Sequence, residues 1–229
     1  ATDASSAATT QSFVITVTNT NDAPTLSSAI SDASTAEDSA YSLDVTGNFD
    51  DVDASDTLTY AATGMPSTLT MSNAGTLSGT PLQANVGTHT IVVTATESAS
   101  AGGSVSDTFV LTVTNVNDVP TVSSAIADAS TAEDSAYSSD ISGNFADEDG
   151  TTLTYTATGM PSTLTMSTAG TLSGTPLQAN VGTHTIVVTA SDGSLTVADT
   201  FVLTVTNVND VPTVSSAIAD ASTAEDSAY

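Results

Sequence analysis

The sequence predicts an all-β protein built from tandem seven-stranded Greek-key β-sandwiches joined end to end. Three observations predict it: apolar and polar residues alternate along many short segments, no segment has a helical period, and a unit of domain size recurs. A formal net charge of −26 on 229 residues would by itself suggest disorder. However, 39% of the residues are hydrophobic and they follow the β pattern, so we expect a folded chain.

A repeat unit runs along the chain. Glu37, Glu133 and Glu225 occupy the same place in "STAEDSAY" and are 96 and 92 residues apart. Residues 64–95 and 159–190 differ at a single position. The size of the unit is that of a β-sandwich domain. We predict a first repeat at 23–118 and a second at 119–210, flanked by the last strand of a preceding repeat at 1–22 and the first strand of a following repeat at 211–229.

The strands of the first repeat follow from alternation and from the turn residues between them. In "AYSLDVT", Tyr41 and Leu43 point to one face, and Tyr60 in "TLTYAAT" also points inward. The segment "STLTMSNAGTLSG" predicts a hairpin with its turn at 73–75. The predicted strand segments are 25–31, 40–46, 57–63, the two arms of 67–79, 88–95 and 107–114, with equivalents in the second repeat.

One inward position differs between the repeats. Leu43 is replaced by Ser139 in the second repeat, although the neighbouring sequence is otherwise closely similar. A large-to-small change in a core typically costs a few kcal/mol, so the sequence predicts a less stable second repeat.

The composition excludes several classes of partner and chemistry. The chain has no lysine or arginine, so we expect neither nucleic-acid binding nor attachment to an anionic bilayer through a basic patch. It has no cysteine, which rules out disulfides and thiol chemistry. No apolar run approaches membrane-spanning length, so we expect no membrane insertion within this sequence.

Catalytic residues are not evident. His89 and His184 are equivalent residues with the parity of Ile91 and Val93, which predicts a structural role near the edge of the core. Neither histidine has a credible catalytic partner in the sequence, and no Gly-x-Ser-x-Gly elbow occurs. We therefore expect a protein that is not an enzyme.

Acidic side chains recur at equivalent places in each repeat. In the first repeat, Asp51 and Asp53 of "FDDVD" follow the second strand, and Glu97 of "TATE" lies before the last strand. The two loops can lie at the same end of a sandwich, where the Asn-x-Asn-Asp motif of the preceding repeat arrives. Glu37 in "TAED" lies near the start of its domain and can reach an end along the first strand. The equivalent residues of the second repeat are Asp147, Asp149, Asp192 and Glu133.

The chemistry of these groups points to calcium. Asn-x-Asn-Asp precedes a proline at 19–22, 115–118 and 207–210. Clusters of Asp, Glu, Asn and backbone oxygens suit Ca²⁺, which takes six to eight oxygen ligands, whereas zinc prefers Cys and His. The alternative is a solvated acidic loop whose Asx side chains only build turns. The adjacent acids Asp38, Asp44 and Asp140 are interpreted as surface charge.

The motifs "TAEDS", "GTLSGTP", "VGTHTIVVTASDG" and "DTFVLTVTNVNDVP" resemble those of cadherin-like repeats, closest to the dystroglycan-type cadherin-like modules of large bacterial surface proteins. The resemblance covers nearly the whole chain. It implies an immunoglobulin-like sandwich and calcium at each joint between repeats. The sequence departs from the animal cadherin pattern in three ways: Asn115 and Asn207 stand in place of Asp, the linker is one residue shorter before proline, and "GTLSGTP" stands in place of a Leu-Asp-Arg-Glu motif. The smaller number of carboxylates implies one or two ions per joint rather than three.

The resemblance also implies which residues hold the ions. One joint would use Asn19, Asn21 and Asp22 with Asp51, Asp53 and Glu97. The next would use Glu37, Asn115, Asn117 and Asp118 with Asp147, Asp149 and Asp192. The residues Glu133, Asn207, Asn209 and Asp210 would await a downstream repeat.

Two functions remain open on the sequence alone. The first is a non-catalytic, calcium-rigidified stalk or fibre outside the cell, in a bacterial adhesin or surface filament, with neighbouring repeats, copies of itself or another cell-surface molecule as partners. The second is a cadherin-like module that binds a glycan or a protein. Exposed aromatic side chains would favour the second, but aromatic residues make up only 4% of the chain.

Overall fold

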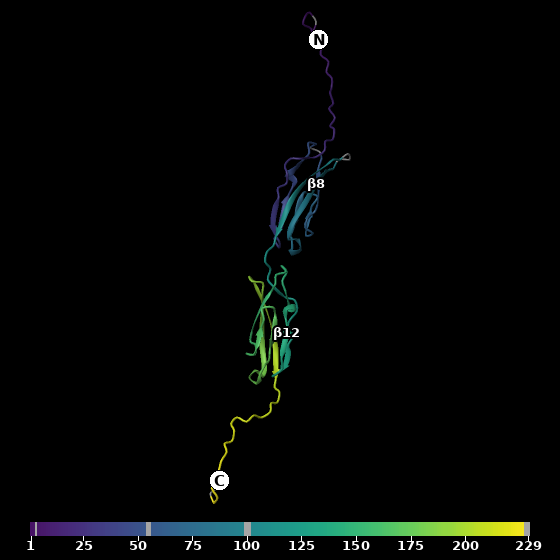
Figure 1. Ribbon diagram of the computed structural model, residues 1–229. Coiled ribbons are helices and arrows are strands. Elements are labelled where there is room, and N and C mark those ends of the chain that lie inside the picture. Colours follow the sequence, from purple (N-terminus) through teal and green to yellow (C-terminus); the bar gives the residue numbers. More distant parts are fainter. Residues whose placement is uncertain (3, 54–55, 99–101, 227–229) are drawn as a thin grey trace. The chain divides into compact units, whose positions relative to one another are not determined.

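A computed structural model describes residues 1–2, 4–53, 56–98 and 102–226 (Figure 1). The chain divides into two compact units, Ala1–Asn117 and Asp118–Tyr229. Each unit contains an all-β sandwich, and the helices among the described residues are four single turns of 3-10 helix. The predicted fold class, all-β sandwiches in tandem, is thereby confirmed.

In the first unit two sheets form the sandwich. A four-stranded sheet has the order β2-β9-β8-β5, and a three-stranded sheet has the order β3-β7-β6, which gives seven strands. Six of them match predicted segments, but the opening strand predicted at 25–31 is wrong, because only Thr25–Leu26 of it is a strand, outside these two sheets, and β2 takes its place in the sandwich. A small additional ladder joins β1 and β4. The strands are β1 (Thr25–Leu26), β2 (Ala33–Ala36), β3 (Tyr41–Asp44), β4 (Phe49–Asp50), β5 (Leu58–Thr63), β6 (Leu69–Met71), β7 (Thr76–Gly79), β8 (Gly87–Glu97) and β9 (Ser104–Thr114).

The second unit repeats this topology. Its sheets have the orders β11-β18-β17-β14 and β12-β16-β15, with β10 and β13 forming the small ladder. The strands are β10 (Thr121–Val122), β11 (Ala129–Ala132), β12 (Tyr137–Asp140), β13 (Phe145–Ala146), β14 (Thr154–Thr158), β15 (Leu164–Met166), β16 (Thr171–Gly174), β17 (Gly182–Ser191) and β18 (Thr196–Thr206).

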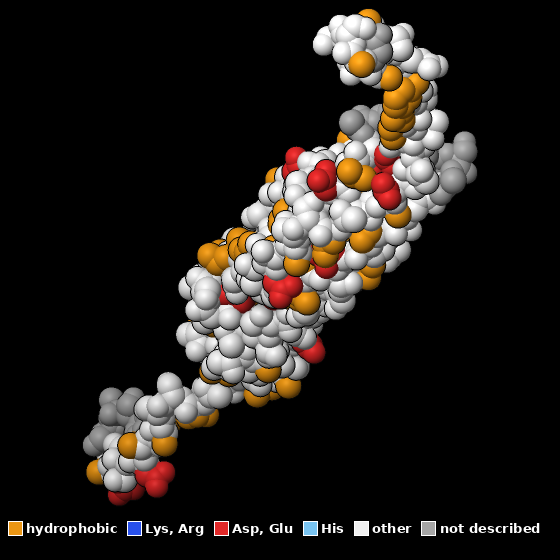
Figure 2. All heavy atoms as spheres, turned by 90° about the horizontal axis from the view of Figure 1, so that it is seen from above, with side chains coloured by type: hydrophobic (Ala, Val, Ile, Leu, Met, Phe, Trp, Pro, Cys, Tyr) orange, Lys and Arg blue, Asp and Glu red, His pale blue; other side chains and the backbone are white. Residues whose placement is uncertain are grey.

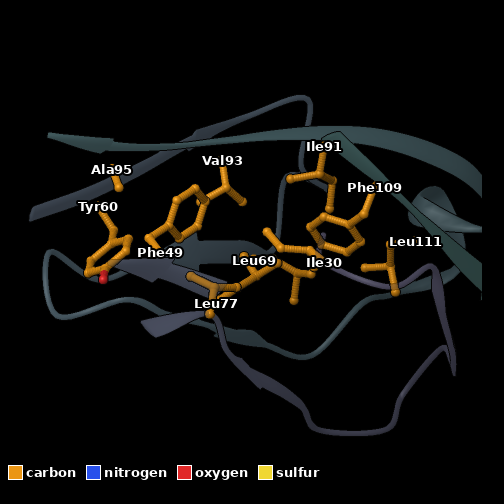
Figure 3. Close-up of a cluster of buried hydrophobic side chains, with 11 residues drawn as sticks. Ile30, Phe49, Tyr60, Leu69, Leu77, Ile91, Val93, Ala95, Phe109 and Leu111 are labelled. Atoms are coloured by element: carbon orange, nitrogen blue, oxygen red, sulfur yellow. The ribbon is translucent and has the colours of Figure 1, made fainter. Parts of the chain in front are cut away.

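The core lies between the two sheets, as Figure 3 shows for the first unit. Inward residues of β8 and β9, such as Ile91 and Phe109, are fully buried because alternate side chains of a strand face the same side. Tyr60 of β5 packs against Phe49 with a ring-centroid distance of 5.9 Å. The inward orientation predicted for Tyr60 is confirmed, and Phe109 is likewise buried in the core.

The predicted hairpin is also confirmed. Strands β6 and β7 pair antiparallel, and Gly75 in the turn has φ +89°, a conformation that favours glycine. The predicted structural role of the histidines fits their surroundings, because Nε2 of the half-buried His89 lies 2.7 Å from the Asn85 carbonyl oxygen. His184 and Asn180 repeat this contact in the second unit.

Strand β2 is a feature that the sequence analysis did not anticipate. Its sequence, Ala-Ser-Thr-Ala, has short side chains and little hydrophobic contrast. It forms because it pairs in parallel with β9, the last strand of the unit. Residues 9–24 carry no strand, and Phe13 and Ile15 are exposed, although the matching residues of β9 are buried. The flanking strands proposed for residues 1–22 and 211–229 stay predictions, and residues 3 and 227–229 lie outside the described part.

The serine at position 139 leaves less apolar packing in the second unit. Leu43 packs against the core of the first unit opposite Leu77, whereas Ser139 lies opposite Leu172. Substitution of Val45 by Ile141, which is also buried, returns one methylene to the second core. We therefore still expect the second unit to be less stable than the first, but by a smaller margin.

We expect Ser139→Leu to raise the free energy of unfolding of the second unit by about 1 kcal/mol, because the new side chain buries part of its apolar surface. Leu43→Ser should lower that of the first unit by a similar amount. Urea unfolding of the full chain, followed by hydrogen exchange to assign each transition, measures both. A loss of stability in Ser139→Leu would show instead that this position has no room for leucine.

Candidate metal centre

A cluster of acidic side chains lies at one end of the first unit. Three segments supply it: residues 19–22 ahead of β1, the loop that follows β4, and the end of β8. Residues 19–22 carry no strand, and hydrogen bonds to Asp53 and Glu97 hold this segment beside the loop after β4 and the end of β8. Figure 2 shows acidic side chains in red on the surface, and the sequence supplies no lysine or arginine to neutralise them.

Asp53 anchors the segment ahead of β1. Its Oδ1 accepts a hydrogen bond from the Asn19 amide at 2.5 Å, and its Oδ2 accepts one from the Asp22 backbone N–H at 2.7 Å. Its own backbone N–H donates to Asp51 Oδ1 at 2.9 Å. The Asp22 N–H, followed by the Asn19 amide, lowers the pKa of the Asp53 carboxyl, because donors stabilise its ionised form.

Glu97 holds the same segment from the other side. Its Oε1 accepts a hydrogen bond from the Asn21 amide at 2.9 Å and a second from the Gly103 backbone N–H. The Gly103 N–H, followed by the Asn21 amide, lowers the pKa of Glu97. The side chain is only 5% exposed, so this carboxylate is kept charged in a nearly buried position. Both asparagines of the segment, Asn19 and Asn21, thus use their amides to position carboxylates.

Two carboxylate oxygens of the cluster have no partner. Asp51 Oδ2 and Glu97 Oε2 are buried and accept no hydrogen bond. One carboxylate oxygen from each of Asp51, Asp56 and Glu97 lies within 4.8 Å of the others. An unsatisfied buried anionic oxygen is costly, and the three carboxylates repel one another at this distance. Their oxygen chemistry and convergence fit a hard divalent cation such as Ca²⁺.

Asp56 titrates differently from its neighbours. Partial burial, and then the charges of Glu97, Asp51 and Asp53, raise its pKa. An acid with a raised pKa in the folded state takes up its proton more readily there than in the unfolded chain. Without metal, its ionisation therefore destabilises the fold, progressively as pH rises through the raised pKa, and the penalty is absent below the pKa of the unfolded chain.

We expect Asp56→Asn to raise the melting temperature in EGTA at neutral pH, and to weaken calcium binding in the same protein. The gain should disappear at a pH below the ordinary pKa of an aspartate, where Asp56 is protonated in both states. Asp38→Asn removes an equal charge from an exposed site and serves as control. Differential scanning calorimetry measures the shift, and an unchanged or lowered melting temperature in EGTA would contradict the electrostatic interpretation of the cluster.

The second unit contains equivalents of several of these residues. Asp149 Oδ2 accepts the Asp118 backbone N–H at 2.7 Å, the same distance as in the first unit. Asp147 Oδ2 is buried and accepts no hydrogen bond. Asp192 differs from Glu97 because its Oδ1 accepts two backbone N–H groups of its own turn, from Ser194 and Leu195 at 2.6 and 2.7 Å.

A buried glutamate marks the opposite end of each unit. Glu37 and Glu133 are each 1% exposed and immediately follow β2 and β11. Glu37 Oε1 accepts the Val116 N–H at 2.8 Å, and Glu133 Oε1 accepts the Val208 N–H at 2.7 Å. Both glutamates therefore lie beside the Asn-x-Asn-Asp segment that follows the last strand of their own unit.

A second group of acids converges at this end of the second unit. Glu133, Asp134 and Asp210 each bring one carboxylate oxygen within 4.8 Å of the others. Asn209 donates to the Asp210 carbonyl oxygen at 3.4 Å, and Asn207 Oδ1 accepts from Gln178 at 3.1 Å. Asn115 and Asn117 are exposed in the segment after β9. The predicted ligand set that joins residues of both units stays a prediction.

Sequence reasoning missed Asp56 and Asp134. Asp56 lies three residues after Asp53, and the second repeat has Gly-Thr-Thr in this shorter loop, so comparison of the repeats gave it no weight. Asp134 is equivalent to Asp38, which was interpreted as surface charge, and both have positive φ, 58° and 54°. Asp38 and Asp134 are both exposed, so exposure does not distinguish the residue that joins an acidic group from the one that does not.

Comparison with known proteins identifies the family. Residues 23–114 and 119–206 match the family described as "Putative Ig domain". The chain belongs to the putative Ig domain family. The two matched ranges correspond to the two sandwiches, so each repeat is one Ig-like domain.

Among curated proteins, the chain is similar to the "Serine-rich adhesin for platelets" of Staphylococcus aureus strain MRSA252, with 37% identity over 142 residues. The match covers 60% of this chain and 10% of that protein, so the chain spans a small part of its relative's length. Other strains of the same species carry adhesins of the same name with equal identity, of which the chain covers 6%.

Solved cadherin structures share the fold. Mouse cadherin-23 EC22-24 aligns with 81% of this chain and 65% of that chain, at a TM-score of 0.56 and 19% identity. Drosophila N-cadherin EC1-4 aligns with 82% of this chain and 50% of that chain, at a TM-score of 0.50 and 17% identity. These values show a cadherin-like fold. A search of the described residues finds no helix that is long and apolar enough to span a membrane.

Proposed function

We propose that this chain is a non-catalytic structural repeat region of an extracellular stalk or fibre, rigidified by calcium at the ends of its Ig-like domains. The observation that carries the proposal is the pair of buried, unpartnered carboxylate oxygens on Asp51 and Glu97. A chain without lysine or arginine cannot neutralise them internally with those side chains, so the neutralising charge must come from outside.

In the first unit, the residues that would hold the ion lie close together. Asp51, Asp56 and Glu97 would offer carboxylate oxygens, and Asp53 would hold Asp22 beside them. The Asn19 and Asn21 amides donate to these carboxylates and so keep the segment ahead of β1 against the sandwich. Bound calcium would supply positive charge and further fix that segment to the domain.

The same role extends to the other proposed ligands by repetition. Asp118, Asp147, Asp149 and Asp192 occupy the positions of Asp22, Asp51, Asp53 and Glu97 in the next repeat. Glu37, Asn115 and Asn117 would complete that set, while Glu133, Asn207, Asn209 and Asp210 would serve a following repeat. An ion at each such place would limit bending between domains, which suits a spacer of defined reach.

Several features support a structural role at the cell surface. The two repeats have closely similar sequences. A series of similar domains suits a spacer that provides length, because domains with separate chemical activities would be expected to differ. The similarity to a surface adhesin favours a bacterial adhesin or surface filament as the parent. The alternative of a glycan- or protein-binding module gains little support from the repeats, since Tyr60 and Phe109 are buried in the core.

Calcium titration tests the proposal. Calorimetry should show calcium binding to the full chain, and small-angle scattering should show a longer, stiffer particle in calcium than in EGTA. Magnesium at equal ionic strength is the control for charge screening, and it should reproduce neither effect fully because it demands tighter octahedral geometry. Indifference of both measurements to calcium would overturn the proposal, and binding without stiffening would remove the rigid stalk.

A further inference from the structure

The first and last strands of each sandwich are hydrogen-bonded neighbours. In the first unit, β2 pairs in parallel with β9, in a register that runs from Ala33 opposite Leu111 to Ala36 opposite Thr114. The chain enters this ladder at the beginning of β2 and leaves the unit at the end of β9. Because the strands are parallel, tension along the chain pulls them in opposite directions along their common axis.

Side-chain carboxylates extend the ladder beyond the start of β2. Asp32 Oδ1 accepts the backbone N–H of Val110 at 2.8 Å. In the opposite direction, from the segment before β2 to β9, the backbone N–H of Ile30 donates to Asp107 Oδ2 at 2.6 Å. Each strand therefore supplies a carboxylate that replaces a backbone carbonyl as acceptor, and hydrogen bonds to charged groups are stronger than those between neutral ones.

Glu37 extends the ladder at its other end. The Glu37 backbone N–H donates to the Thr114 carbonyl oxygen at 3.0 Å, and its buried Oε1 accepts the Val116 N–H at 2.8 Å. The Thr114 hydroxyl donates to the Thr35 carbonyl oxygen at 3.3 Å. The connection between the first and last segments thus runs from residue 30 to residue 37, about twice the length of β2.

The second unit has the same connection, bond for bond. Strand β11 pairs in parallel with β18 over four residues. The flanking bonds are Val202 N–H to Asp128 at 2.7 Å, Ile126 N–H to Asp199 at 2.7 Å, Glu133 N–H to Thr206 at 3.0 Å and Val208 N–H to Glu133 at 2.7 Å. Recurrence in both units indicates a feature of the repeat rather than of one domain.

We propose that this carboxylate-extended ladder is a force-bearing clamp, which resists extension of each repeat because tension loads its hydrogen bonds together in shear. The other ladder near the entry, between β1 and β4, has only two residue pairs and cannot bear the load alone. The clamp consists of protein groups, so it forms without calcium, although the carboxylates of Glu37 and Glu133 belong both to the clamp and to the proposed ion sites.

Single-molecule pulling of the full chain tests the clamp, and the chain has no cysteine, so attachment points can be chosen freely. Val116→Cys provides a shared handle beyond β9. Force applied between the handles Ser31→Cys and Val116→Cys loads opposite ends of the ladder, so its hydrogen bonds are loaded together in shear. Force applied between the handles Ser39→Cys and Val116→Cys loads one end of the ladder, so its hydrogen bonds open in sequence from that end. All three positions are exposed. In EGTA, we expect the second geometry to rupture at a force lower by about twofold or more, because its hydrogen bonds break one at a time.

A variant pair distinguishes the clamp from general stability. Asp32→Ala should lower the rupture force in the shear geometry. Asp44→Ala removes a carboxylate that caps Thr46 outside the ladder, and it should leave that force unchanged. Thermal melting of both variants reports any general loss of stability. Equal rupture forces in the two geometries, or equal losses in the two variants, would overturn the clamp, whatever the outcome of calcium titration.

Discussion

The double substitution Glu97→Gln and Asp51→Asn is expected to abolish the calcium-dependent rise in melting temperature of the first Ig-like domain. At a calcium concentration of 100 times Kd, one site adds about 2.7 kcal/mol to the free energy of unfolding, and the variant should lose this gain. Both substitutions conserve shape, and each removes one of the two carboxylates of the first domain with buried, unpartnered oxygens. Calorimetric titration and thermal melting in calcium and in EGTA measure the loss.

The domain itself should stay folded in this variant. After Glu97→Gln, the side-chain carbonyl oxygen at this position can still accept from the Asn21 amide, and removal of two repelling charges should leave the metal-free domain as stable as before or more so. The control variant Asp38→Asn with Asp44→Asn changes the charge equally at exposed positions. Full calcium response in the double variant would show that the ion, if bound, lies elsewhere.

Gly64→Ala is expected to destabilise the first domain by about 3 kcal/mol or more. Gly64 follows β5 with φ +76°, and a Cβ built there would lie 2.1 Å from the Thr90 carbonyl oxygen of β8. The obstacle is backbone of a central strand, which cannot move without breaking the sheet. Gly159, with φ +77° and the same distance to Thr185, predicts an equal loss in the second domain.

Gly47→Ala is the matched control, because nothing lies within 4 Å of a Cβ at that position. It should change the free energy of unfolding by less than about 1 kcal/mol. Urea unfolding of the three variants, with the two domains assigned separately, gives the comparison. A Gly64→Ala variant as stable as Gly47→Ala would mean that β5 and β8 approach less closely than the structure shows.

Much of the fold could be predicted because its signals are local. The 73–75 turn and the alternation in "THTIVVTA" depend on neighbouring residues only, and these segments form the predicted hairpin and strand. Strand β2 escaped prediction because its sequence carries no amphipathic pattern and its pairing partner is β9, more than seventy residues away. Its position follows from the sheet and from the carboxylates of Asp32 and Asp107, not from propensity.

The candidate site was predictable in part for the same reason. Asp51, Asp53 and Glu97 recur at repeat spacing, and the structure brings them to the segment that contains Asn19 and Asn21. The role of the asparagines was not predictable, since their amides donate to carboxylates. The sequence suggested the side-chain oxygens of Asn19 and Asn21 as ligands, whereas the structure shows the NH2 end of each side-chain amide donating to a carboxylate. Asp56 was not predictable from the repeat, because the second repeat has no acid at the matching place of its shorter loop.

The hairpin between β8 and β9 has a consequence for how such a chain can diversify. In the first unit Gly103 of this hairpin donates to Glu97, whereas in the second unit the shorter turn satisfies Asp192 through Ser194 and Leu195. This hairpin is thus one of the places where the two repeats differ in length, while the strands on either side of it pair in the same way. Such a hairpin can change length and sequence without altering the sheets that hold the core, so the acceptors and donors around this carboxylate position can differ from one domain to the next.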